Sequence, residues 1–158
     1  MRGSRALIGT ALAAGALAAA SLALAPAAAA VTPGSAQANY DCGSWGGGTA
    51  TLSATQSGTS ATITINSAVT TPIAVGANQI NATLTLAKRG GGTVKFTGKR
   101  NPALPANSAV TIGPLNGTVA SGNVLDSYFA GTALSMTIFG VPVNCDALTS
   151  QTPGPFVF

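Results

Sequence analysis

Short runs in which apolar and hydroxyl side chains alternate restrict the fold of this chain more than any other feature. In residues 50–55 Ala and Leu alternate with Thr and Ser, and in residues 61–66 Ala and Ile alternate with Thr and Asn. A period of two places successive side chains on opposite faces of a β-strand. Similar runs continue to residue 145, and no helical period longer than two turns occurs after residue 30. The sequence therefore predicts an all-β protein.

Turn-forming residues divide these runs into hairpins. Ser57-Gly58-Thr59 separates the first two runs, and Gly90-Gly91-Gly92 marks the clearest later hairpin. Pro102 and Pro105 indicate a loop, because proline cannot donate to a strand ladder. Seven or eight strands spaced about ten residues apart predict a single antiparallel β-sandwich. The immunoglobulin pattern does not fit, because the two Cys residues bracket nearly the whole domain.

The first thirty residues have the layout of a secretory signal. Arg2 and Arg5 precede an apolar run, and small Ala residues follow it up to Ala30; this order is typical of a cleaved export signal. A retained membrane anchor is the alternative, but the run consists mostly of Ala and Gly. A cut after Ala38 is a second option for cleavage. We predict four segments and no membrane span after processing: a signal peptide (1–30), a short polar segment (31–41), a disulfide-closed β-sandwich (42–150) and a Pro-rich apolar tail (151–158).

The apolar tail ends in Phe158, which raises the question of an outer-membrane barrel. Such a barrel needs strands of about ten residues with an apolar lipid-facing set on each. Pro153 and Pro155 interrupt the last segment, and the outward positions elsewhere are Thr and Ser. We therefore expect Phe156 and Phe158 to pack back on the sandwich.

The sequence contains two cysteines, Cys42 and Cys145. An even number of cysteines in an exported chain indicates a disulfide, and this one would join the two ends of the domain. Two free thiols or a metal pair is the alternative, but the chain has no His and no third Cys to complete a metal site. We predict a Cys42–Cys145 bridge, no metal and no cofactor.

Residues suited to acid–base catalysis are scarce. The chain has no His and no Glu, and its carboxylates are Asp41, Asp126 and Asp146; the usual general bases are therefore missing. Asp41 and Asp146 each neighbour a cysteine, so the disulfide would bring them close enough to bind Ca²⁺ or to share a proton. We interpret them instead as solvated charges or turn caps, and Asp126 as an Asx turn. The sequence predicts a protein that is not an enzyme.

Basic residues are confined to one stretch of the predicted domain. Five of them, opposed by three Asp, leave a net charge of +2 once residues 1–30 are removed. We expect them to make one end of the molecule positive, and we favour the interpretation that they protect an edge hairpin from pairing with other strands. The alternative is that they attract an anionic cell-envelope polymer or lipid, but not nucleic acid. These candidate anion-binding residues are Lys88, Arg89, Lys95, Lys99 and Arg100.

Two aromatic residues lie together near the first cysteine. Tyr40 and Trp45, beside Gly46-Gly47-Gly48, are the best candidates in this sequence for a glycan-binding platform. The competing interpretation is that Trp45 covers the disulfide.

Several motifs resemble those of small secreted actinobacterial proteins whose domain has no assigned activity. They are Tyr40-Asp41-Cys42-Gly43, Val141-Pro142-Val143-Asn144-Cys145 and the Gln151-Thr152-Pro153-Gly154-Pro155 tail. The resemblance covers about residues 38–158, and implies export, a sandwich fold and the disulfide, but no ligand. We expect a secreted, non-enzymatic structural or interaction module of the extracellular space or cell surface. The alternative is a binding domain for anionic envelope polymer or lipid headgroups.

Overall fold

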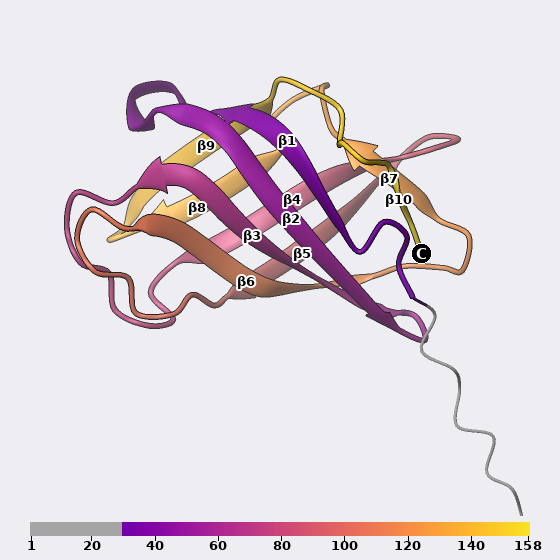
Figure 1. Ribbon diagram of the computed structural model, residues 1–158, viewed down its shortest axis with the longest axis horizontal. Helices are drawn as coiled ribbons and strands as arrows, with labels where there is room; N and C mark the ends of the chain where they lie inside the picture. The colour runs from indigo at the N-terminus through magenta and orange to yellow at the C-terminus, as the bar shows by residue number, and fades with distance from the viewer. Residues whose placement is uncertain (1–29) are drawn as a thin grey trace, which may run out of the picture.

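The computed structural model describes residues 30–158, so the predicted signal peptide lies outside the described residues except for Ala30. The described chain is built from β-strands and one short 3-10 turn, η1 (Gly43–Trp45) (Figure 1). The strands are β1 (Ser35–Asp41), β2 (Gly47–Ser57), β3 (Ser60–Thr70), β4 (Asn81–Lys88), β5 (Thr93–Lys99), β6 (Ala109–Thr118), β7 (Val124–Ser127), β8 (Leu134–Ile138), β9 (Val141–Ala147) and β10 (Phe156–Val157). No helix in this part of the chain is long and apolar enough to cross a bilayer.

Eight of the strands close into an antiparallel barrel. Their order around the ring is β1, β2, β3, β6, β5, β4, β8 and β9, and β9 returns to β1. The ring closes because β4 pairs with both β5 and β8, so that neither of these strands leaves a free edge. The predicted all-β antiparallel class is confirmed, but the two-sheet sandwich is wrong. Alternation determines which face of a strand is buried, and the buried face looks the same in a sandwich and in a small barrel.

The remaining strands, β7 and β10, continue the lines of β8 and β9. The first half of β4 pairs with β8, through Leu84 and Leu134, and the second half pairs with β7, through Leu86 and Ser127. In the same way β10 pairs with β7, and its Val157 bridges to Thr32. Strands β7 and β8 thus occupy one position in the barrel wall and are separated by residues 128–133. Strands β9 and β10 occupy the next position and are separated by residues 148–155.

The predicted domain boundaries differ from the structure at both ends. Residues 35–41, expected in a polar segment outside the domain, form strand β1 between β2 and β9. The tail is also part of the barrel, because Gln37 bridges to Thr152 and Thr32 to Val157. Phe156 and Phe158 are buried, as expected, and the ring of Phe158 stacks on Phe96 with their centroids 6.1 Å apart.

Alternate side chains of each strand fill the interior, and Thr, Ser and Asn cover the outside. The fully buried set includes Leu52, Ile63, Ile65, Leu84, Leu86, Ile112 and Leu115. On the outer surface the hydroxyls of Thr55 and Thr62 lie 2.8 Å apart, and Thr111 donates to Asn66 at 2.7 Å. The predicted disulfide is confirmed: Cys42, just after β1, is bonded to Cys145 in β9, 103 residues later.

The two ends of the barrel are built differently. One end carries η1 with its flanking residues, the loop over residues 71–80, the loop over residues 100–108 and the turn at residues 139–140. We call this end the mouth, and it lies at the left in Figure 1. The start of β1 and the C-terminus lie at the opposite end, where Phe96, Phe156 and Phe158 pack together.

Candidate functional site

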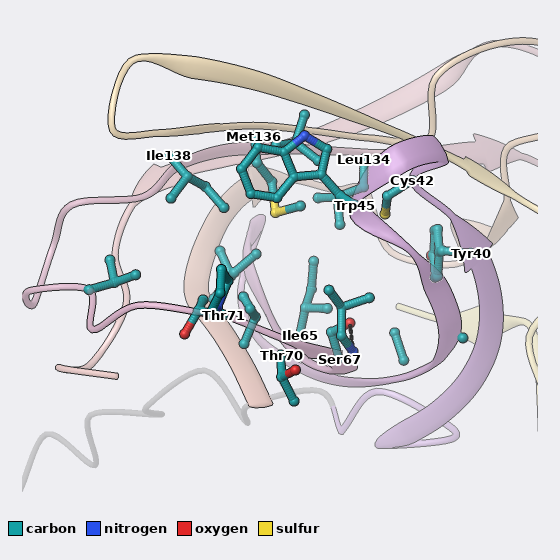
Figure 2. A pocket seen from close by; sticks show the side chains of 18 of the residues that line it. Tyr40, Cys42, Trp45, Ile65, Ser67, Thr70, Thr71, Leu134, Met136 and Ile138 are labelled. Atoms are coloured by element: carbon teal, nitrogen blue, oxygen red, sulfur yellow. Dashed lines mark hydrogen bonds between the residues drawn. The ribbon is translucent and has the colours of Figure 1, made fainter. Parts of the chain in front are cut away.

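An apolar cavity of about 100 Å³ opens inside the mouth (Figure 2). Its inner wall consists of buried aliphatic side chains from four strands, namely Ile65 of β3, Ile112 of β6, Leu134 and Met136 of β8, and Val143 of β9. A dry cavity of about 150 Å³ lined in this way can bind benzene, so the smaller space here suits at most a single ring or the end of an alkyl chain.

Small residues on β2 and β3 leave this space unfilled. Gly48 and Ala50 line it from β2, and Ser67, the register partner of Ala50, lines it from β3. The pairing of β3 with β6 also breaks down here, because the register shifts between Asn66 and Thr70. Such an irregularity bends a strand away from its neighbour. The cavity therefore follows from short side chains and a bent strand at the same level of the barrel.

Three large apolar side chains surround the opening. Trp45 is 39% exposed, and Ile73 and Phe139 are each 56% exposed, yet all three also line the cavity. They come from η1, the 71–80 loop and the β8–β9 turn. Figure 2 shows the Trp45 indole beside Met136 and Leu134, with Thr70, Thr71 and Ser67 on the opposite side of the opening. We call Trp45, Ile73 and Phe139 the rim.

The rim is held by specific contacts. The loops over 71–80 and 100–108 are joined by a Val75–Leu104 bridge and by the buried side chain of Asn101. Asn101 Oδ1 accepts from the N–H groups of Gln79 and Ile80 at 2.8 Å, and its amide donates to the Gly76 and Pro102 carbonyls. On the other side, the disulfide fixes Cys42 at the start of the Trp45 turn. The opening is therefore largely preformed.

The cavity lining carries no formal charge. Its aliphatic hydroxyls belong to Ser67, Thr70 and Thr71, and two of these already have backbone partners. Ser67 Oγ accepts from the Val69 N–H at 3.0 Å, and Thr71 Oγ1 donates to the Pro105 carbonyl at 3.5 Å. A charged guest would lose its hydration without gaining a partner, so this lining favours a neutral, apolar one.

Tyr40 is the titratable residue in the cavity wall. Its hydroxyl is buried and has no hydrogen-bond partner within the described part of the chain. Burial raises the pKa of Tyr40 well above its ordinary value, and the nearby charge of Asp126 raises it further. The hydroxyl therefore stays protonated. A glycan platform made with Trp45 is wrong, because Tyr40 points into the barrel and cannot reach the surface.

The five predicted anion-binding residues are all exposed, but they do not gather at one end. Lys88 and Arg89 lie at the end opposite the mouth, and Lys95 lies on the outer face in the middle of β5. Lys99 and Arg100 lie at the mouth. The expectation of one positive end is wrong, because the β4–β5 hairpin runs the full length of the barrel. The cations form a stripe along its outer side.

Two of the three carboxylates accept backbone hydrogen bonds. Asp41 and Asp146 are register partners on β1 and β9, close together as expected, and Asp41 accepts from the Gly43 N–H at 2.9 Å as a turn cap. Asp126 accepts from the N–H groups of Ser127 and Gln151, at 2.7 and 2.9 Å, and so ties the tail to β7 instead of forming an Asx turn. Residues 30–158 contain no group of three or more His, Cys, Asp or Glu residues placed to hold a metal ion.

Sequence reasoning did not find the cavity. Ile73 and Phe139 lie in loops and turns, where alternation gives no information, and Ala50 and Ser67 look like ordinary strand residues. The one available signal was Trp45, a large apolar residue between Cys42 and three glycines. No protein-family model, curated protein or solved structure matches this chain.

Proposed function

We propose that this chain is a secreted, non-enzymatic interaction module that takes a small neutral apolar molecule, or the apolar end of a larger one, into the mouth of the barrel. One observation carries the proposal: an uncharged cavity of about 100 Å³ opens between the exposed rim residues Trp45, Ile73 and Phe139. Open apolar pockets at the mouths of β-barrels are common ligand sites. A preformed rim also lowers the entropy cost of binding.

The expected affinity is modest. Each buried methylene contributes about 0.8 kcal/mol, so four of them supply roughly 3 kcal/mol before the costs of association. The chemistry of the wall supports binding without turnover. Tyr40 is the ionisable group among the described lining residues, and its raised pKa keeps it from acting as a base.

The single tryptophan provides a direct assay. Trp45 lies at the opening, and its emission overlaps the absorption of the neutral dye N-phenyl-1-naphthylamine. The phenyl ring of the dye should enter the cavity while its naphthyl group stays at the rim, so bound dye should quench Trp45 fluorescence. Straight-chain 1-alkanols should displace the dye, with affinity rising about fourfold per added methylene until the cavity is full.

Variants that fill the cavity provide the test. Ala50→Phe fills it from within, and Val69→Phe, at a half-buried position, fills it near the opening. Both should lose dye binding while keeping the far-UV spectrum of the fold. Val124→Phe, at a half-buried valine of β7 away from the mouth, is the matched control and should bind as the wild type does. Absence of quenching in the wild type, or full binding by folded Val69→Phe, would contradict the proposal.

A second candidate function is binding of an extended anionic polymer of the cell envelope. The supporting observation is the stripe of exposed cations, in which Lys95 and Lys99 share the outer face of β5. Retention on a dextran sulfate column should disappear when all five basic residues are changed to Gln. Thr93→Gln with Thr97→Gln, on the same face, is the control. Retention that survives the five changes would refute this candidate.

A further inference from the structure

We infer that the rim docks on an anionic lipid bilayer, with Trp45, Ile73 and Phe139 entering the interface and Lys99 facing the headgroups. The bilayer would then be the source of the apolar guest, and this part of the inference rests on the proposed function.

The first line of support is the concentration of exposed apolar side chains at one end. Three separate segments each contribute one large side chain to the rim, and all three side chains are more than one-third exposed. Clustered apolar exposure of this kind marks an interaction site, whereas scattered exposure does not. Tryptophan is also enriched at the level of lipid headgroups, where its ring is partly apolar and its N–H stays wet.

Phe139 occupies an unusual backbone conformation. Its φ is 53° and that of the following Gly140 is 79°, a pair of positive values that two-residue hairpin turns normally assign to Asn and Gly. A bulky residue is disfavoured there, and the ring gains little burial in exchange, since it stays 56% exposed. A strained position that holds an exposed aromatic ring favours a role for Phe139 in binding, and not in stabilising the fold.

A second, more open hollow adjoins Phe139 on the outer wall. It is lined by Lys99, Gln79, Asn81 and Thr137, together with Phe139 and Gly140. Asn81 pairs in register with Lys99 on one side and with Thr137 on the other, so these polar side chains form one row at the edge of the mouth. A cation and side-chain amides beside an exposed ring match the phosphate and the upper acyl region of an anionic lipid.

The charges at the mouth also give the docking an orientation. Lys99 is the last residue of β5 and Arg100 follows it, whereas Asp41 and Asp146 lie on β1 and β9. In the eight-strand ring β5 and β1 stand on opposite sides. An anionic surface attracts the first pair and repels the second, so the β4–β5–β8 side of the mouth should approach it most closely. Because rim residues also line the cavity, an apolar guest could pass from bilayer to barrel without crossing water.

Flotation with lipid vesicles tests the inference. The purified protein should float with vesicles of equal parts phosphatidylglycerol and phosphatidylcholine, and more weakly with phosphatidylcholine alone. Phe139→Ser and Ile73→Ser should each lower vesicle affinity by about tenfold, the value expected when one large apolar side chain no longer enters the lipid. The matched control is Phe129→Ser, because Phe129 is 57% exposed but lies in the 128–133 loop; it should bind within about twofold of the wild type.

Two further variants separate the parts of the inference. Lys99→Gln should remove the preference for anionic vesicles, as added salt should, while leaving the weaker binding to phosphatidylcholine. Folded Ala50→Phe, or Val69→Phe if Ala50→Phe does not fold, should lose the dye but keep vesicle binding. If the wild type floats but does not bind the dye, the proposed function fails and the docking surface stands.

Other outcomes would overturn the docking surface. Equal vesicle binding by Phe139→Ser and Phe129→Ser would mean that the rim has no special part in docking. Sedimentation velocity that shows a dimer dissociated by Phe139→Ser, together with no flotation, would assign the rim to a second copy of the chain instead.

Discussion

Gly117 and Ala50 affect the barrel interior in opposite ways. The ring of Phe96 lies so close to Gly117 that a Cβ at this position would be 2.5 Å from it, so the missing side chain lets the ring fill the far end of the barrel. The register partners of Ala50 are the small residues Ala38 and Ser67, and the cavity remains. A small residue beside a large ring thus gives a filled region of the barrel, and a small residue beside other small residues leaves an empty one.

Tyr40 gives a prediction about alkaline pH. The pKa of Tyr40 is raised in the folded state. Below about pH 10 the folded and the unfolded chain both keep the Tyr40 proton, so this residue causes no loss in the free energy of unfolding there. Above that pH the unfolded state ionises first, and the free energy of unfolding should fall by up to about 1.4 kcal/mol per pH unit.

Urea unfolding at pH 8 and pH 11 checks this prediction. Tyr40→Phe should lose much less stability between the two pH values than the wild type, and at pH 8 it should be close to neutral, because the hydroxyl it removes has no partner in the described structure. Tyr128→Phe, which removes a hydroxyl that donates to the Ala130 carbonyl at 3.2 Å, should keep the wild-type dependence. Equal losses in wild type and Tyr40→Phe would refute the assignment.

At the scale of elements, the strands and the disulfide were predictable and the closure was not. Runs such as 61–66 have a clear period of two, and the cysteine count leaves one pairing. Closure depends on β4 pairing with β8 about fifty residues later in the chain, and no local pattern encodes a long-range pairing. Strand β7 lies within the predicted run 124–129, whereas the two-residue strand β10 was missed, because it is defined by its pairing with β7 and not by alternation.

The two-residue strand β10 should contribute more to stability than its length suggests. Phe156 is fully buried, whereas its neighbour Val157 is 42% exposed. Phe156→Ala should lower the free energy of unfolding by about 3–5 kcal/mol, since it opens a cavity beside Phe158. Val157→Ala should cost less than about 1 kcal/mol. Similar values for the two variants in urea unfolding would show that the tail is not part of the core.

The disulfide should stabilise the connection between β1 and β9. It closes a loop of 103 residues, for which chain entropy gives at most about 4.7 kcal/mol, and native bridges typically contribute about 2–5 kcal/mol. The double variant Cys42→Ser with Cys145→Ser should therefore unfold at markedly lower urea concentration. Intact mass should show two fewer hydrogens in the native than in the reduced wild type. Two thiols that alkylate under native conditions would contradict the bridge.

At the scale of the whole molecule, the barrel has one end filled by aromatic rings and one end left open. Phe96, Phe156 and Phe158 fill the first, and the rim surrounds the second. The burial of Phe156 and Phe158 was predictable from the sequence, but the contrast between the two ends was not, because each end is assembled from loops and tails whose neighbours are distant in the chain. The same limit applies to the basic residues. Their clustering in sequence was plain, but their spread along the barrel depends on the direction of β5.

The central claim, that the open end accepts an apolar guest, is tested most directly by amide chemical shifts. In ¹H–¹⁵N spectra of the purified protein, added 1-decanol should shift the signals of residues that line the cavity, such as Ile65, Ser67 and Met136. The signals of Leu125 and Phe156, at the filled end, should stay in place. Shifts confined to the filled end, or no saturable shifts at all, would contradict the account.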